Sequence, residues 1–284
     1  MRTHALSRLC LVGVLAAAVP ACKKAEKPSL TLKELAPAPL PGVAAPAPSD
    51  SGTDDRDAAY RVRAAPVFGA GLPPTAQRIT ISDGHVWLGA ADWNPGAPDA
   101  AAALAQFLGS RPALLSPDAD TYVLQAAALF AALDDAHVPT WLLHPSGQVA
   151  YPLILRDEPA FGAWVQEAKE GRIRIVQRED GLELSTTIGK LLGPDPSGPS
   201  VPVRGGQLDV AAERAGLSRL KERFTHADEL CVLPSFGTEL NKVATVMSGT
   251  YRAAGEPFFD KLCLVYSRAQ TQLPVKMPSP GAKP

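Results

Sequence analysis

The sequence predicts an α/β (α+β) protein with two tandem small β-β-α-β-α-β modules that follow a disordered Pro/Ala-rich tether. Three observations support this prediction. The stretch that begins at Leu114 returns 117 positions later at Cys231, with a proline and a threonine at the same places in both copies. Each copy is a short apolar run, a polar turn and a helical run. An Asp-Gly pair between two alternating runs precedes each copy, and this pattern favours a β-hairpin.

The first 21 residues have the features of a lipoprotein signal peptide. Two early arginines form a positive region, and the apolar run Leu9–Ala18 is too short for a membrane-spanning helix, which needs about 20 residues. Val19-Pro20-Ala21-Cys22 resembles a bacterial lipobox, which implies that Cys22 is lipidated and anchors the chain to a membrane. Ordinary secretion with cleavage after Ala21 is the alternative.

Residues 22–66 are predicted to form a lipid-anchored, disordered tether. Prolines such as those in Ala36–Pro41 remove backbone donors and fix φ, which prevents a helix or a central strand. At about 3.1 Å per residue, such a tether would reach on the order of 100 Å when extended. We therefore expect an envelope protein that faces the periplasm, with inner or outer membrane left open.

The first module is predicted over residues 67–150. Asp99 is placed to cap a helix that Gly109 ends, and Asp118 or Asp120 to cap the next helix. In order, the expected elements are strands 79–81 and 86–88 around Asp83-Gly84, a helix from Asp99 to Gly109, strand 113–116, a helix from about Thr121 to Ala136, and strand 140–144.

Residues 151–169 connect this module to the second one, predicted over 170–268. The connection contains a strand at 149–155 and a short helix at 159–166. In the second module the expected elements are strand 172–177, a turn at Asp180-Gly181, strand 182–184, a Pro/Gly loop over 190–206, a helix capped by Asp209, strand 230–233, a helix over 239–254 ended by Gly255, and strand 262–266. Residues 269–284 are predicted to be a disordered tail.

Two cysteines fall in strands of the second module. Cys231 and Cys263 are expected on neighbouring parallel strands, whose spacing of about 4.8 Å lies near the lower end of the Cα distances found in disulfides. The periplasm is oxidising, so we predict a bridge between them. Two small core residues are the alternative, because Leu114 and Leu142 stand at the matching places of the first module.

The order of elements resembles the periplasmic domain of the ExbD/TolR biopolymer-transport family, present twice. The residues that carry the resemblance are Ile79–Leu88 and Leu114–Leu143 in the first module, and Ile173–Leu184 and Cys231–Tyr266 in the second. The resemblance implies a non-enzymatic protein near a transport or envelope-integrity complex. Family members have an N-terminal transmembrane helix with an aspartate that serves proton-driven work, and we expect neither here.

We predict no catalytic residue, no metal site and no cofactor. We also predict no nucleic-acid partner, since the net charge is only −1. Ser218 and Lys221 match a Ser-x-x-Lys pattern but lie within an amphipathic helical run, where a solvated face explains them. Helix caps and a helix end explain four aspartates better than a cation site does: Asp118, Asp120, Asp134 and Asp135. Four histidines lack the spacing of metal ligands: His85, His137, His144 and His226.

The predicted function is therefore binding. A lipid-anchored protein of this build is expected to contact an envelope protein or peptidoglycan, with the oligomeric state left open. The alternative is a ligand- or substrate-binding periplasmic lipoprotein with a cleft between the modules, and a hydrolase without a recognisable motif is the third possibility.

Overall fold

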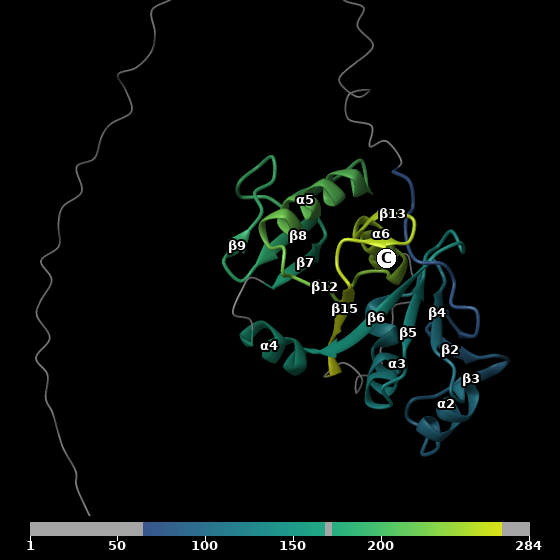
Figure 1. Cartoon of the computed structure of the whole chain (residues 1–284). Helices are drawn as coiled ribbons and strands as arrows, with labels where there is room; N and C mark the ends of the chain where they lie inside the picture. The colour runs from purple at the N-terminus through teal and green to yellow at the C-terminus, as the bar shows by residue number, and fades with distance from the viewer. Residues whose placement is uncertain (1–64, 168–171, 269–284) are drawn as a thin grey trace, which may run out of the picture. The chain divides into compact units, whose positions relative to one another are not determined.

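The structure, a computed structural model, describes residues 65–167 and 172–268 (Figure 1). The predicted signal peptide, Cys22, nearly all of the tether and the predicted tail lie outside the described residues. The five described helices are α2 (Ala100–Leu108), α3 (Val123–Asp135), α4 (Glu158–Gln166), α5 (Val210–Arg223) and α6 (Leu240–Gly249).

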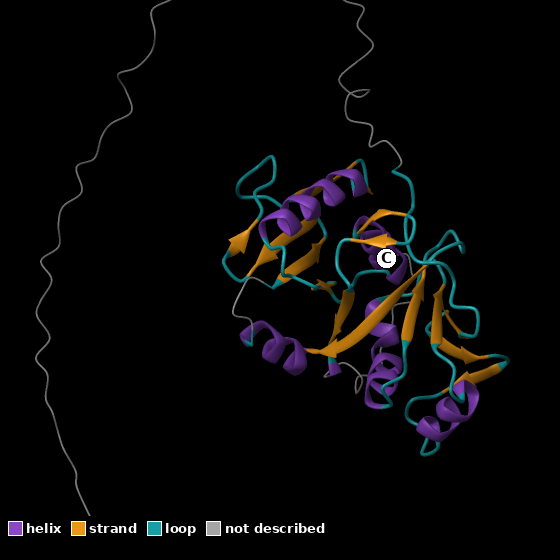
Figure 2. Ribbon diagram, viewed as in Figure 1, coloured by secondary structure: helices purple, strands orange, loops and turns teal. Residues whose placement is uncertain are grey.

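Thirteen strands join into one mixed sheet, which Figure 2 shows as a continuous row. In chain order, all described strands are β1 (Gln77–Ser82), β2 (His85–Leu88), β3 (Ala91–Trp93), β4 (Ala113–Pro117), β5 (Thr140–Leu143), β6 (Ala150–Asp157), β7 (Ile173–Arg178), β8 (Gly181–Thr186), β9 (Gly189–Lys190), β10 (Val201–Arg204), β11 (Gln207–Leu208), β12 (Glu229–Leu233), β13 (Tyr251–Ala253), β14 (Glu256–Pro257) and β15 (Lys261–Tyr266). The sheet order is β11-β10-β8-β7-β12-β15-β6-β5-β4-β1-β2-β3, with β9 on β8; β13 and β14 form a separate hairpin.

The strand order on the two sides of β6 is the same. On one side the order is β2-β1-β4-β5, with an antiparallel β1–β2 hairpin and parallel β1–β4 and β4–β5 pairs. On the other side the order is β8-β7-β12-β15, with an antiparallel β7–β8 hairpin and parallel β7–β12 and β12–β15 pairs. Strand β6 pairs antiparallel with β5 and parallel with β15, so one sheet runs through both halves without interruption.

The loops that precede α3 and α6 touch each other. The backbone N–H of Val123 donates to the carbonyl of Thr238 at 2.9 Å, and the N–H of Leu240 donates to the carbonyl of Thr121 at 2.8 Å. The two threonines and the two donors are each separated by 117 positions, so the sequence repeat appears in the fold as a reciprocal pair of hydrogen bonds.

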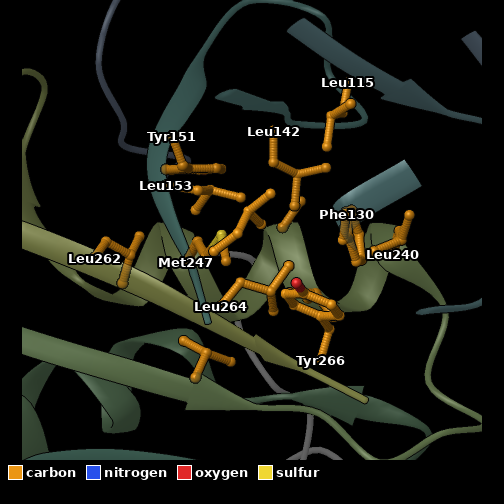
Figure 3. Close-up of a cluster of buried hydrophobic side chains, with 14 of the residues drawn as sticks. Leu115, Phe130, Leu142, Tyr151, Leu153, Leu240, Met247, Leu262, Leu264 and Tyr266 are labelled. Atoms are coloured by element: carbon orange, nitrogen blue, oxygen red, sulfur yellow. The ribbon is translucent and has the colours of Figure 1, made fainter. Parts of the chain in front are cut away.

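Alternation along the central strands separates two faces of the sheet. Leu262, Leu264 and Tyr266 of β15 point into the main core, where Phe130 of α3 and Met247 of α6 also lie (Figure 3). Helices α2, α3, α5 and α6 all contribute buried residues to this core. The intervening residues of β12 and β15, including both cysteines, lie on the other face with Trp164 of α4.

Several expected element boundaries were wrong. Helix α6 ends at Gly249 instead of 254, because Thr250 caps it through its N–H and its hydroxyl, both bonded to the carbonyl of Met247. The chain then forms the β13–β14 hairpin, in which Gly255 takes a φ of 74°. The segment 190–206, expected to be a Pro/Gly loop, is not all loop. It contains the last residue of β9 and the whole of β10, and β10 adds to the sheet beside β8.

Of the three expected aspartate caps, one is present. The Asp209 carboxylate accepts from the N–H of Ala212 at 2.9 Å and caps α5. Neither Asp118 nor Asp120 caps α3, where the side chain of Gln125 accepts from the N–H of Tyr122 at 2.7 Å instead. Asp99 stands at the start of α2 without a side-chain cap bond.

Candidate functional site

A pocket of about 850 Å³ lies where β7 and β12 end in the second half of the sheet. Its walls come from the β7–β8 hairpin, from Leu208 of β11, from the loop Ser235–Thr238 and from Lys242 of α6. Clefts at the carboxyl ends of parallel strands are common ligand sites, because loops there are free of pairing. Phe236, half exposed at 52%, adds an apolar surface to this wall.

The polar side chains of this pocket differ in whether they have a hydrogen-bond or ion-pair partner. Gln177 is buried, and its side-chain oxygen has no hydrogen-bond partner among the described residues. Arg178 is paired with Asp180 at 3.1 Å, and Lys242 with Glu239 at 3.0 Å. A buried amide oxygen without a donor costs free energy, so the site favours a ligand that supplies a donor.

A smaller pocket, of about 320 Å³, occupies the matching place in the first half. Gln125 and Ala128 of α3 line it, and Lys242 and Thr245, 117 positions later, line the larger pocket. Its rim holds His85, whose Nδ1 lies 3.0 Å from the carboxylate of Asp92. The two halves therefore place a hollow between hairpin and helix in the same way but line it differently.

The two predicted disulfide residues lie at bonding distance on the face of the sheet opposite the main core. Cys231 and Cys263 are direct partners across parallel β12 and β15, with Cα atoms 4.4 Å apart and sulfurs 2.03 Å apart. The expectation that Leu114 and Leu142 of the first half stand at the places of the two cysteines was wrong. Leu114 pairs with Trp141 across β4 and β5, whereas Leu142 faces the main core.

A buried polar group stands beside this disulfide. Glu229 lies within 4.8 Å of the two sulfurs, a grouping that resembles a ligand set for a metal. Its two oxygens already accept from Arg156 at 2.7 Å and from the indole N–H of Trp164 at 2.8 Å. With the sulfurs bonded to each other and the carboxylate paired, these residues present a closed structural cluster.

Sequence reasoning missed a second buried carboxyl group, Glu213 of α5. Its side chain is fully buried, both oxygens lack a hydrogen-bond partner among the described residues, and burial raises the pKa of Glu213 well above its usual range. Gly249 of α6 makes room for it, since a Cβ there would lie 2.3 Å from the carboxyl group. A glutamate in the first turn of an amphipathic helix gives no sequence signal of such burial.

Its neighbour Arg214 is partly buried and holds backbone carbonyls of other segments. The guanidinium donates to the carbonyls of Tyr251 at 2.7 Å and Pro66 at 3.2 Å, and it stacks on Phe68. The N–H of Phe68 donates to Ser248 at 3.2 Å. Arg214 therefore fixes the path by which the chain enters the fold.

The remaining sequence candidates are dispersed. Ser218 bonds to Glu222 at 3.1 Å and Lys221 to the carbonyl of Ala227, so they form no nucleophile–base pair with each other. The four aspartates do not converge: Asp118 lies in the loop before α3, and Asp134 and Asp135 at its far end contact Tyr266 and Arg268. Burial lowers the pKa of His144.

Comparison of the chain with protein-family models, curated sequences and solved structures finds no match. Among the described residues, no helix combines the length and the apolar character that crossing a membrane requires.

Proposed function

We propose that the chain is a non-enzymatic, lipid-anchored envelope protein whose two halves are ExbD/TolR-like modules that bind a protein partner or peptidoglycan near a transport or envelope-integrity complex. The observation that carries this proposal is the recurrence of one loop at an offset of 117. Both copies follow a parallel strand, precede a core helix and exchange backbone hydrogen bonds.

Binding, and not turnover, is supported by what the described polar groups do. The buried carboxylate of Glu229 is occupied by two donors, and Ser218 and Lys221 have separate partners. Sheet edges and pockets recruit partner segments without any chemical step. Lipidation of Cys22, which the lipobox-like sequence favours, supplies the membrane attachment in this proposal.

Fractionation and native crosslinking test the proposal together. The wild-type protein is expected in the membrane fraction with an acylated Cys22, and Cys22→Ala in the soluble fraction. Crosslinking in native cells is expected to recover a membrane-complex component or peptidoglycan, more with the wild type than with Cys22→Ala. A soluble, unacylated wild type would refute the anchor, and robust hydrolysis of ester, peptide or glycan substrates would refute the non-enzymatic function.

The larger pocket favours a second candidate, a ligand-binding lipoprotein. Its site lies within the second half, beside Phe236, and not in a cleft between the modules. Thermal-shift screening of small metabolites and sugars, with Phe236→Ser as the matched control, distinguishes the two candidates. A saturable stabilisation that Phe236→Ser abolishes supports the ligand-binding function.

A further inference from the structure

The C-terminal end of the predicted tether lies at the larger pocket. Ala65, the first described residue, forms part of its wall together with Leu208 and Phe236. The next residue, Pro66, is held through its carbonyl by Arg214 at 3.2 Å. The residues before Ala65 are therefore attached to the chain at the wall of the pocket, because Ala65 lines it and Pro66 is held by Arg214.

The pocket has the chemistry to receive an aromatic and basic segment. Leu182, Leu208 and Phe236 supply apolar surface. The buried oxygen of Gln177 lacks a donor, and the carboxylate of Glu179 at the rim has no ion-pair partner among the described residues. An aromatic ring with a hydroxyl donor, next to a cation, would satisfy all three features.

The sequence immediately before Ala65 carries that chemistry. It is Tyr60-Arg61-Val62-Arg63, which alternates large apolar residues with arginines, and Tyr60 is the sole aromatic residue of the first 64. Five residues in extended form span roughly 16 Å at about 3.3 Å each, enough to reach across a pocket of this volume.

We propose that residues 60–63 occupy the pocket of their own chain. Tyr60 packs its ring against Leu208 and Phe236 and donates its hydroxyl to Gln177, while an arginine of the segment pairs with Glu179. This occupancy depends neither on the lipid anchor nor on the identity of a partner. Because a short linker gives an effective concentration on the order of 1 mM, even a weakly binding segment fills the pocket and must be displaced by any external one.

Site-specific photocrosslinking in the full chain tests the occupancy directly. A photoreactive phenylalanine analogue at position 60 is expected to crosslink within the same chain to peptides that contain Leu208 or Phe236. The matched control places the analogue at Val43, farther along the tether, where a much lower yield is expected. Equal yields from the two positions, or crosslinks from position 60 outside the pocket, would overturn the proposal.

A labelled synthetic peptide with the sequence of residues 56–64 provides a second test. Added to full-length protein, it is expected to bind Tyr60→Ala about tenfold more tightly than wild type, since the internal competitor at about 1 mM is weakened. Tyr60→Phe, which keeps the ring, is expected to behave more like wild type, and Phe236→Ser to lose the peptide. Equal affinity for wild type and Tyr60→Ala, or no binding to either, contradicts the proposal and leaves the fractionation results of the anchor untouched.

Discussion

The two halves of the sheet differ most in the loops that follow β4 and β12. In the first half the Asp118 carboxylate accepts from the hydroxyl of Thr121 and from the N–H of Asp83 at 3.2 Å, which ties the loop to the neighbouring hairpin. In the second half the hydroxyl of Ser235 bonds, among the described residues, to Thr238 alone, at 2.8 Å, and Phe236 is exposed.

The pockets beside these loops differ in the same sense. The first is about 320 Å³ and the second about 850 Å³. The comparison teaches that the shared arrangement rests on backbone groups, because the carbonyl of each threonine and the N–H two residues later make the reciprocal bonds. The residues between strand and threonine are free to diverge, and there one half closes its loop while the other keeps a pocket open.

The largest expected effect comes from removing the disulfide, which the second half has and the first half lacks. Replacing both Cys231 and Cys263 by alanine should lower the free energy of unfolding by about 3–4 kcal/mol, because the bridge closes a loop with a sequence separation of 32. Urea unfolding with and without reductant measures this loss. As a control from the other half, Leu114→Val should cost only about 1 kcal/mol. A wild type indifferent to reductant would contradict the crosslink.

Helices α2 and α5, which follow the hairpins of the two halves, differ at the position of Glu213. Counting from the aspartate at each helix start, its counterpart in α2 is Ala103, which carries no charge. Replacing Glu213 by the similarly shaped methionine should stabilise the fold by about 1–3 kcal/mol at pH 8, since it removes a buried polar group that has no hydrogen-bond partner among the described residues.

The pH dependence of this effect has a definite sign. Because burial raises the pKa of Glu213 in the folded state, its contribution to stability is fully present below the pKa of the unfolded carboxyl group and is lost as pH rises toward the folded pKa. The gain from Glu213→Met should thus be larger at pH 8 than at pH 4. Thermal melts at both values measure it, with the exposed Glu222→Met as control, and a pH-independent gain would contradict a protonated Glu213.

The paired threonines should differ in importance. Thr121 is almost fully buried, and its hydroxyl bonds to the carbonyl of Ile81 at 2.9 Å as well as to Asp118. The hydroxyl of Thr238 contacts Ser235 alone among the described residues. We expect Thr121→Val to cost about 1–2 kcal/mol and Thr238→Val about 1 kcal/mol or less. Chemical denaturation of both variants checks the ranking, and the reverse order would show that the second loop is the tighter one.

The smallest effect is expected at the exposed aromatic residue of the second loop. Phe236→Ser should change the free energy of unfolding by less than about 0.5 kcal/mol, as for surface substitutions that leave no cavity. The same variant is expected to lose peptide binding. A large destabilisation would place Phe236 in the structural interior of the second half and remove it from the pocket wall.

Much of the fold could be predicted from local sequence signals. The hairpins at Asp83-Gly84 and Asp180-Gly181 follow from turn chemistry, and the Asp209 cap follows from helix-start chemistry. Neighbouring strands for Cys231 and Cys263 follow from the expected strand–helix–strand order. These signals are local, so they survive whatever the rest of the chain does.

The wrong boundaries arose where pairing between strands decides. The expected helix to 254 stops at Gly249 because the following residues pair as a hairpin, and β10 forms because β8 offers an open edge. Gly181 is required at that edge, since a Cβ there would lie 2.2 Å from the carbonyl of Val201. The residue pattern of 190–206 gives no sign that part of this segment will pair with β8.

The sequence alone therefore determined most of the element types, the 117-residue recurrence and the neighbouring strands of the two cysteines, because these depend on residues close together or on strands joined by one helix. Only the tertiary structure decided that β6 joins both halves into one sheet, that Glu213 is buried without a hydrogen-bond partner among the described residues and that a pocket opens beside Phe236. Each of these depends on side chains brought together from distant parts of the chain, and burial there is set by what packs against a residue, not by the residue itself.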